Sequence, residues 1–164
     1  MKRLLLVRHA KSDWSQPDLP DHERPLNKRG LRDAPLMAKV WTQHVARPDV
    51  ILSSTALRAL QTAREFAKAW GVEESAIVLE PRLYLAGRRT LLDIVQNLSD
   101  KAQLAAMFGH NEGLSEFFCW LVDREGEIMP TCAGALIRFE VDSWKDVSPG
   151  IGLLERYDYP KKYY

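Results

Sequence analysis

The sequence predicts an α/β protein built around a mostly parallel sheet. Short apolar runs alternate along the chain with segments whose apolar residues recur at helical spacing, and this alternation is typical of such folds. Two of the runs end abruptly near a histidine: Leu4–Val7 precede Arg8 and His9, and Leu104–Phe108 lie just before His110. Because open α/β sheets bind ligands beyond the carboxyl ends of their strands, both histidines are candidates for a functional site.

The chain has 164 residues, a length that predicts one domain over residues 1–164. Its net charge of +1 supplies no overall field for nucleic acid or an anionic membrane, and no apolar stretch is long enough to span a bilayer. The apolar part of Lys2–Val7 is too short for a secretion signal, so we expect a first core strand in a cytoplasmic protein. Cys119 and Cys132 have no metal-binding spacing and are expected to be buried free thiols.

The first third of the chain predicts a strand, a loop and a helix. Residues 2–7 form the strand, and residues 11–25, which include three prolines, form a surface loop. Asn27 is an N-cap candidate for a helix that runs to about residue 43, although Gly30 weakens its start. The expected core face of this helix consists of Leu31, Ala34, Met37, Ala38 and Trp41.

The rest of the chain continues the alternation. The segment Ser53–Thr55 follows a short strand at residues 50–52 and offers caps for a helix at residues 56–70, which Gly71 ends. The further strands are expected at residues 76–80, 104–108, 135–141 and 152–157, and the further helices at residues 90–98 and 111–122. The final strand is a candidate for an antiparallel edge, which is common on such sheets.

Three strand-to-helix exits carry polar residues to one edge of this sheet. The first delivers Arg8 and His9, the second Arg58, and the third His110 and Asn111. Helix N-termini and arginines favour phosphate, so Arg8, Arg58 and Asn111 are expected to bind a phosphate group. An imidazole beside them can attack phosphorus and carry the phosphoryl group transiently. His9, with Arg8 adjacent, is the better nucleophile candidate, and His110 is expected across the phosphate from it.

A metal site is the competing use of two histidines. Two arginines would repel the cation and no carboxylate is obviously placed to offset them, so neither a metal nor another cofactor is expected. His22 lies in the polar loop and His44 near an expected helix end, and solvated or capping roles are expected for both.

Three motifs, in this order, resemble the histidine phosphatase superfamily, which has the phosphoglycerate-mutase-like fold. They are Leu6–Ser12, Leu52–Ala63 and Gly109–Asn111. Within that family, Arg24–Gly30, Leu83–Ala86 and the compact length resemble the short bacterial phosphohistidine phosphatases. The resemblance runs through nearly the whole chain.

The resemblance implies a fold and a set of roles. The fold would be a three-layer α/β/α sandwich. His9 would be the phosphorylated nucleophile, and Arg8, Arg58 and His110 would complete the phosphate pocket. Larger family members place a phosphate-binding asparagine a few residues after the first motif; Ser15 occupies about that place here, and its hydroxyl is a candidate donor.

One departure from the family pattern concerns the leaving group. Members that cleave phosphate esters usually carry an acidic residue after the third strand, which protonates the departing alkoxide. Tyr84 stands near that position here, and Glu80, just before it, is the candidate acid. The leaving nitrogen of a phosphoramidate can be protonated before departure, so an acid-poor site favours phosphorus–nitrogen cleavage.

These observations favour a metal-independent phosphohistidine phosphatase that removes phosphate from a histidine on a partner protein through a phospho-His9 intermediate. Two alternatives stay open: a small-molecule phosphomonoesterase with Glu80 as general acid, and a phosphohistidine-binding module without turnover. Arg82, Arg88 and Arg89 cluster before an expected helix, where they either steer an acidic partner or form a solvated basic loop.

Overall fold

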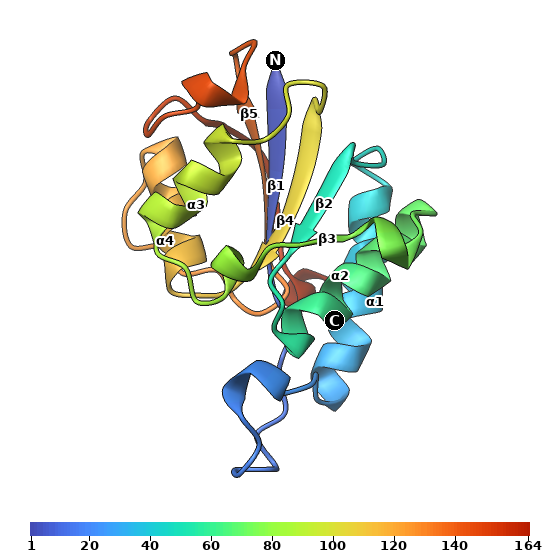
Figure 1. Ribbon diagram of the computed structural model, residues 1–164. Helices are drawn as coiled ribbons and strands as arrows, with labels where there is room; N and C mark the ends of the chain where they lie inside the picture. Colours follow the sequence, from blue (N-terminus) through green and yellow to red (C-terminus); the bar gives the residue numbers. More distant parts are fainter.

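A computed structural model, which describes residues 1–164, contains one six-stranded sheet in the order β3-β2-β4-β1-β5-β6 (Figure 1). The strands are β1 (Lys2–Arg8), β2 (Val50–Ser53), β3 (Val78–Leu79), β4 (Leu104–Gly109), β5 (Gly134–Phe139) and β6 (Leu153–Asp158). The helices are α1 (Lys28–Thr42), α2 (Leu57–Trp70), α3 (Arg88–Gln96) and α4 (Gly113–Val122). Strands β1 to β4 pair in parallel, whereas the β1–β5 and β5–β6 pairs are antiparallel. The prediction of a mostly parallel sheet is confirmed, and the edge strand β6 pairs antiparallel with its neighbour; β5 itself runs against β1, which the sequence analysis did not predict.

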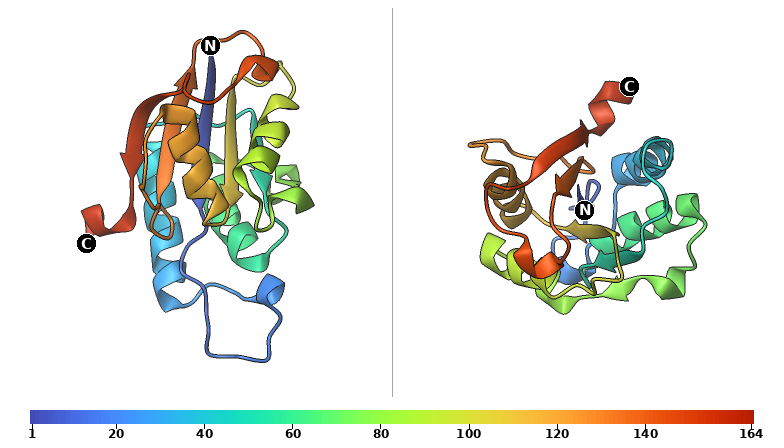
Figure 2. Two further views of the ribbon diagram at one scale, coloured as in Figure 1. Left: turned by 90° about the vertical axis from the view of Figure 1, so that its left-hand side faces the viewer. Right: turned by 90° about the horizontal axis from the view of Figure 1, so that it is seen from above.

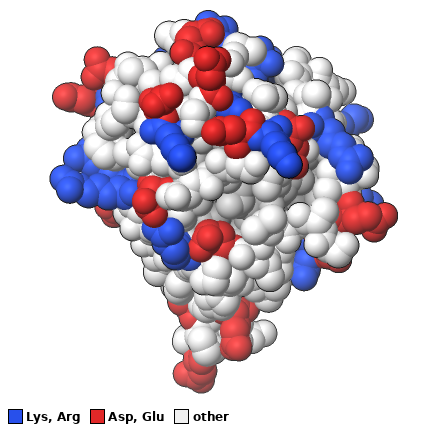
Figure 3. Space-filling view, turned by 45° about the horizontal axis from the view of Figure 1, so that its top comes forward, with Lys and Arg blue, Asp and Glu red and all other residues white.

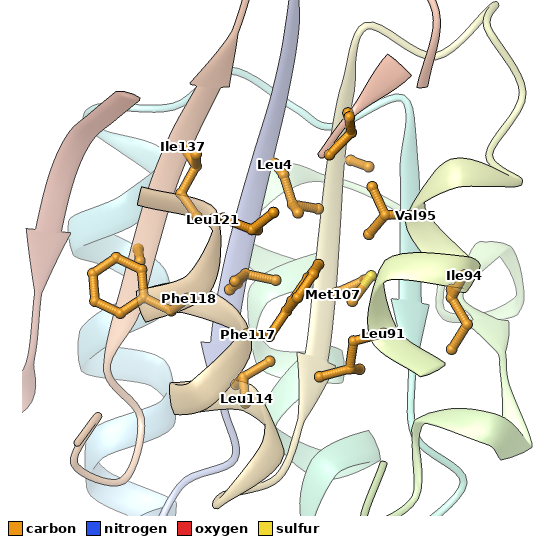
Figure 4. Close-up of a cluster of buried hydrophobic side chains, with 14 of the residues drawn as sticks. Leu4, Leu91, Ile94, Val95, Met107, Leu114, Phe117, Phe118, Leu121 and Ile137 are labelled. Atoms are coloured by element: carbon orange, nitrogen blue, oxygen red, sulfur yellow. The ribbon is translucent and has the colours of Figure 1, made fainter. Parts of the chain in front are cut away.

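The helices cover both faces of the sheet, with α1 and α2 on one side and α3 and α4 on the other (Figures 1 and 2). Successive side chains of a strand point to opposite faces, so β1 sends Leu4 and Leu6 into one core and Leu5 and Val7 into the other. The core under α3 and α4 includes Phe117, which lies over the sheet in Figure 4. The three-layer sandwich that the resemblance implied is therefore confirmed.

The start of α1 shows why the chain has a glycine there. Asn27 is the N-cap, as predicted, and its side chain accepts a hydrogen bond from the Gly30 N–H at 2.9 Å. A Cβ atom at Gly30 would collide with the carbonyl oxygen of Lys11. The glycine that weakens the helix start thus lets the loop after β1 pack closely against α1. This loop extends beyond the carboxyl end of the sheet in Figure 2.

Some element boundaries differ from the sequence prediction. A 3-10 turn at Glu74–Ala76 precedes β3, so only two residues of the strand expected at 76–80 pair with the sheet. Helices α3 and α4 begin two residues earlier and two residues later, respectively, than expected. The N-cap residue of α2 is Ala56, and no side chain forms a capping hydrogen bond there. The prediction that the segment Ser53–Thr55 caps this helix is therefore wrong.

Leu31 does not belong to the core, contrary to the prediction for α1. Its side chain is 59% exposed, and it borders a small surface cavity between the first turns of α1 and α2 together with Leu26 and Gln61. The helical period was correct, since Ala34, Met37 and the rest of the expected face are buried. Leu31 lies near the start of α1, at the end of that face.

Charged side chains of both signs are interspersed over the visible surface in Figure 3. This mixture agrees with the net charge of +1. Anion binding therefore has to come from a few local residues. Both cysteines are buried and free, as predicted. None of the helices has the length and apolar character needed to span a membrane.

Candidate active site

The register of the sheet brings the two histidines together. Arg8 of β1 is paired with Gly109 of β4, so the next residues, His9 and His110, leave neighbouring parallel strands side by side. The backbone N–H of His9 donates to the Gly109 carbonyl oxygen at 3.1 Å. The ring centroids of the two histidines are 5.2 Å apart, and both residues are buried. The strand-end rule thus located the centre of the site.

The hydrogen bonds of His9 define its tautomer. Its Nδ1 lies 2.7 Å from the carbonyl oxygen of Ala10, which can only accept, so Nδ1 carries the proton. Its Nε2 faces the Nε–H of Arg58 at 3.4 Å, where the imidazole nitrogen acts as the acceptor. Both contacts place the lone pair on Nε2, which is the form of imidazole that can attack an electrophile.

Both histidines are held in the neutral form at neutral pH. Burial, with smaller effects from Arg58 and Arg8, lowers the pKa of His9 to about 4, although the hydrogen bond to Ala10 acts in the opposite direction. Burial, followed by the proximity of His9 and Arg58, lowers the pKa of His110 to about 3. The sequence prediction that the arginines favour the neutral imidazole has the correct sign, but burial is the larger cause.

Ser54, the residue after β2, contacts His110. The Ser54 hydroxyl accepts from the Ala56 N–H at 3.2 Å and lies 2.8 Å from His110 Nε2. We infer that the Ser54 hydroxyl donates to His110 Nε2, which places the His110 proton on Nδ1. This Nδ1 atom is buried and has no partner in the protein.

The guanidinium of Arg8 has one nitrogen with a hydrogen-bond partner and one without. Its Nη1 donates to the Met129 carbonyl oxygen at 2.9 Å, and its Nε is buried without a partner. Asn111 donates to the same carbonyl oxygen at 2.9 Å and accepts from the Ser115 hydroxyl at 2.7 Å. Asn111 therefore lies beside the site, as expected, but its amide ties the Met129 segment to α4. Its role as a phosphate ligand stays a prediction.

Asp21 belongs to the site although the sequence did not single it out. It begins a 3-10 turn, Asp21–Glu23, in the loop after β1. Its Oδ2 accepts from Arg58 Nη2 at 3.0 Å and from the Tyr84 hydroxyl at 2.6 Å. The ring of Tyr84 packs edge-on against His110, with centroids 5.5 Å apart. Tyr84 thus occupies the site at the position where the family pattern suggested an acid.

Glu80 and Ser15 have other partners in the structure. Glu80 Oε1 accepts from the backbone N–H of Arg82 at 3.0 Å and caps the 3-10 turn after β3. Ser15 is exposed, and its backbone N–H donates to Asp13 Oδ1 at 2.7 Å. Their proposed roles, as acid and as phosphate donor, stay predictions.

His22 is not simply solvated, as the sequence suggested. It is half-buried, its Nε2 lies 2.7 Å from the Thr55 hydroxyl oxygen, and its ring packs edge-on against Tyr84. The expected arginine cluster is divided: Arg82 forms an ion pair with Asp93 in α3 at 2.7 Å. Arg88 instead stacks over Trp120 in α4, with its guanidinium carbon 4.4 Å from the ring centroid, and Arg89 is exposed.

The fold and the site define a class of protein. An α/β sandwich that gathers two neutral histidines and two arginines at the carboxyl edge of its sheet has the architecture and residue types of a histidine-dependent phosphatase. The chain matches the family model for the histidine phosphatase superfamily (branch 1) over residues 4–84.

One relative and two solved structures are similar to the chain over nearly its whole length. An uncharacterized protein of Mycobacterium tuberculosis is 31% identical over 166 residues, covering 94% of this chain and 100% of the relative. A structure from Agrobacterium tumefaciens, assigned as the phosphohistidine phosphatase SixA, matches with a TM-score of 0.80 and 27% identity, over 97% of this chain and 98% of that one. The protein histidine phosphatase SixA complexed with tungstate, at 20% identity and a TM-score of 0.80 over 99% of both chains, shares the fold. The chain belongs to the histidine phosphatase superfamily and is similar to its SixA-like branch.

Proposed function

We propose that the protein is a phosphohistidine phosphatase that acts on a phosphorylated partner protein through a phospho-His9 intermediate. The observation that carries the proposal is the neutral His9 imidazole, whose Nε2 faces the Nε–H of Arg58 at 3.4 Å beside the ring of His110. Arg8 Nε and His110 Nδ1 are buried without a hydrogen-bond partner in the protein, as are Arg24 Nε, Trp41 Nε1 and Arg138 Nε. With the His110 proton on Nδ1, as inferred above, a phosphoryl group at His9 would offer oxygen acceptors to Arg8 and His110.

The first step transfers the phosphoryl group to His9. The lone pair on His9 Nε2 forms a bond to phosphorus while the bond from phosphorus to the substrate nitrogen breaks. The bonding electron pair leaves with that nitrogen, and the proton already carried by the other ring nitrogen makes the leaving group a neutral histidine of the partner. In the transition state, the negative charge on the three oxygens of the phosphoryl group would be stabilised by Arg8, Arg58 and the Nδ1–H of His110.

The second step returns the enzyme to its starting form. A water oxygen attacks phosphorus, the bond to His9 Nε2 breaks, and the imidazole recovers its lone pair while inorganic phosphate leaves. Nδ1 of His9 keeps its proton throughout, because the Ala10 carbonyl oxygen holds it. In this scheme the two guanidinium groups supply the positive charge, and no metal ion takes part.

The polar groups near the site support phosphorus–nitrogen rather than phosphorus–oxygen cleavage. An alkoxide needs a proton donor as it leaves. The Tyr84 hydroxyl already donates to Asp21, and Glu80 caps a turn. The hydrogen bond from Tyr84 and the guanidinium of Arg58 lower the pKa of Asp21, so this carboxylate is ionised at neutral pH and cannot serve as the acid. Phosphohistidine avoids the requirement because its ring can be protonated before the bond breaks.

Phosphate release from a phosphohistidine-carrying protein, measured beside p-nitrophenyl phosphate, tests the proposal. We expect hydrolysis of the phosphohistidine at a higher kcat/KM than the ester, no effect of EDTA, and loss of turnover in His9→Ala. His44→Ala is the matched control, because His44 is an exposed histidine beyond the end of α1. Preference for the ester would favour the phosphomonoesterase. Binding of the phosphoprotein without turnover would favour the binding module.

A further inference from the structure

Asp21 accepts two hydrogen bonds from Arg58, and no step of the proposed mechanism uses either of them. Its backbone carbonyl oxygen accepts from Arg58 Nη1 at 2.7 Å, and its Oδ2 accepts from Arg58 Nη2 at 3.0 Å. The Arg58 side chain is 6% exposed, whereas that of Asp21 is 39% exposed. Asp21, a residue of the surface loop, therefore binds the buried Arg58 side chain through two of its oxygen atoms.

The two contacts occupy one edge of the guanidinium. Arg58 has five N–H groups in a plane, and Asp21 takes the terminal edge formed by Nη1 and Nη2. The side edge consists of the Nε–H and the second N–H of Nη2. It faces His9, because Arg58 Nε lies 3.4 Å from His9 Nε2. Because the guanidinium is planar, the two hydrogen bonds at its terminal edge also fix the orientation of its side edge. The side edge of Arg58 therefore stays directed at His9.

Tyr84 in turn holds Asp21. The Tyr84 hydroxyl donates to the same Oδ2 atom at 2.6 Å, and its ring lies between those of His22 and His110. The chain Tyr84–Asp21–Arg58 thus connects the loop after β1 and the segment after β3 to the nucleophile from β1. Hydrogen bonds to ionised groups are shorter and stronger than those between neutral groups, so this chain is a stiff one.

We propose that Asp21 is the positioning residue for Arg58, holding its terminal edge so that the side edge binds the phosphoryl group on its way to His9, and that Tyr84 holds Asp21 in place. The proposal rests on the proposed function only for the identity of the phosphoryl donor. Loss of the hydrogen bonds from Arg58 to Asp21 leaves Arg58 charged and near the phosphate, so the affinity for the substrate in the ground state changes little. Transition-state stabilisation requires the fork to be oriented, so kcat carries the loss.

Asp21→Asn, Tyr84→Phe and the double variant test this chain of contacts in the full-length protein. We expect kcat with the phosphohistidine protein to fall roughly 10- to 100-fold in Asp21→Asn, with KM changed less than about threefold. Tyr84→Phe should cause a smaller loss, and the double variant should lose little more than Asp21→Asn alone, because both act on one arginine. Asp18→Asn is the matched control: Asp18 is an exposed aspartate in the same loop, without a hydrogen bond or ion pair.

A pH profile separates positioning from general damage to the loop. The charged groups that face His9 are Arg8, Arg58 and Asp21, and of these only Asp21 raises the pKa of His9. The acid limb of kcat/KM should therefore move to lower pH in Asp21→Asn and stay in place in Asp18→Asn. Wild-type kcat in Asp21→Asn, additive losses in the double variant, or equal losses in Asp18→Asn would overturn the proposal.

Binding of inorganic phosphate, measured by calorimetric titration, keeps the two proposals apart. If wild-type protein releases no phosphate from phosphohistidine, the proposed function fails, and the kinetic comparison moves to p-nitrophenyl phosphate. The Asp21 proposal still predicts phosphate affinity within about threefold of wild type in Asp21→Asn and a slower chemical step. A large loss of phosphate affinity would instead make Asp21 a determinant of binding and contradict the positioning role.

Discussion

Replacing Ser54 with alanine should lower both kcat/KM and the free energy of unfolding, and the two losses can be measured separately. Ser54 is fully buried, and its hydroxyl serves both the Ala56 N–H at 3.2 Å and His110 Nε2 at 2.8 Å. Its removal leaves two buried polar groups unpaired, at about 1–3 kcal/mol each, so we expect the free energy of unfolding to fall by about 2–6 kcal/mol. It also removes the contact that keeps the proton of His110 on Nδ1. A lost preference of about 1.4 kcal/mol changes the ratio of the two tautomers about tenfold, so the share of the active one falls from about nine-tenths to about one-half, and kcat/KM should fall about twofold.

The neighbouring serine provides the control. Ser53 is equally buried, but its hydroxyl donates to the Ser54 carbonyl oxygen at 2.9 Å and does not contact a histidine. Ser53→Ala should lose stability, measured by urea unfolding, while kcat/KM stays at the wild-type value. Nitrogen-15 shifts of the His110 ring should report a changed tautomer in Ser54→Ala only. A folded Ser54→Ala protein with wild-type kcat/KM would refute the assignment of Ser54 as the residue that sets this tautomer.

Two further predictions concern pH and the candidate acid. Unfolded histidines bind protons near pH 6.5, whereas His9 and His110 in the folded protein do so only near 4 and 3. The unfolded state therefore binds more protons below pH 6.5, and the free energy of unfolding should fall as the pH drops from about 6.5 toward 4, by up to about 1.4 kcal/mol per unit for each histidine. Urea unfolding at a series of pH values should show a shallower slope in His9→Asn, and an unchanged slope would argue against a neutral, buried His9. Glu80→Gln keeps an oxygen that can accept from the Arg82 N–H, so hydrolysis of both an alkyl ester, glycerol phosphate, and phosphohistidine should stay within about twofold of wild type. A large loss of ester hydrolysis alone would restore Glu80 as the general acid.

The positions of the strand-end residues could be predicted because they follow from chain order and sheet geometry. Apolar runs that end in polar residues indicate buried parallel strands, and the carboxyl ends of such strands share an edge. His9, Arg58 and His110 met for that reason. The same logic assigned Asn27 to the start of α1, since a cap depends on the residue itself and its nearest neighbours.

Contacts made by irregular segments could not be predicted in this way. Asp21 is one of several acidic residues in a loop without periodicity, and only its tertiary position beside Arg58 distinguishes it. The sequence placed Tyr84 near the expected acid but gave no sign that its hydroxyl would bond to Asp21. Leu31 fitted the helical period, yet it is exposed and borders a surface cavity with Gln61 of α2, a tertiary relation that no local pattern encodes.

The central claim is that His9 carries the phosphoryl group, and trapping that intermediate tests it most directly. A phosphohistidine-carrying protein labelled in its phosphoryl group should transfer label to the enzyme during turnover, and the label should reside in the peptide that contains His9. Phosphohistidine is a phosphoramidate, so the bond should survive alkali and be lost in acid. His9→Ala should show neither label nor phosphate release. Phosphate release at the wild-type rate by His9→Ala, or label on a different residue, would contradict the account.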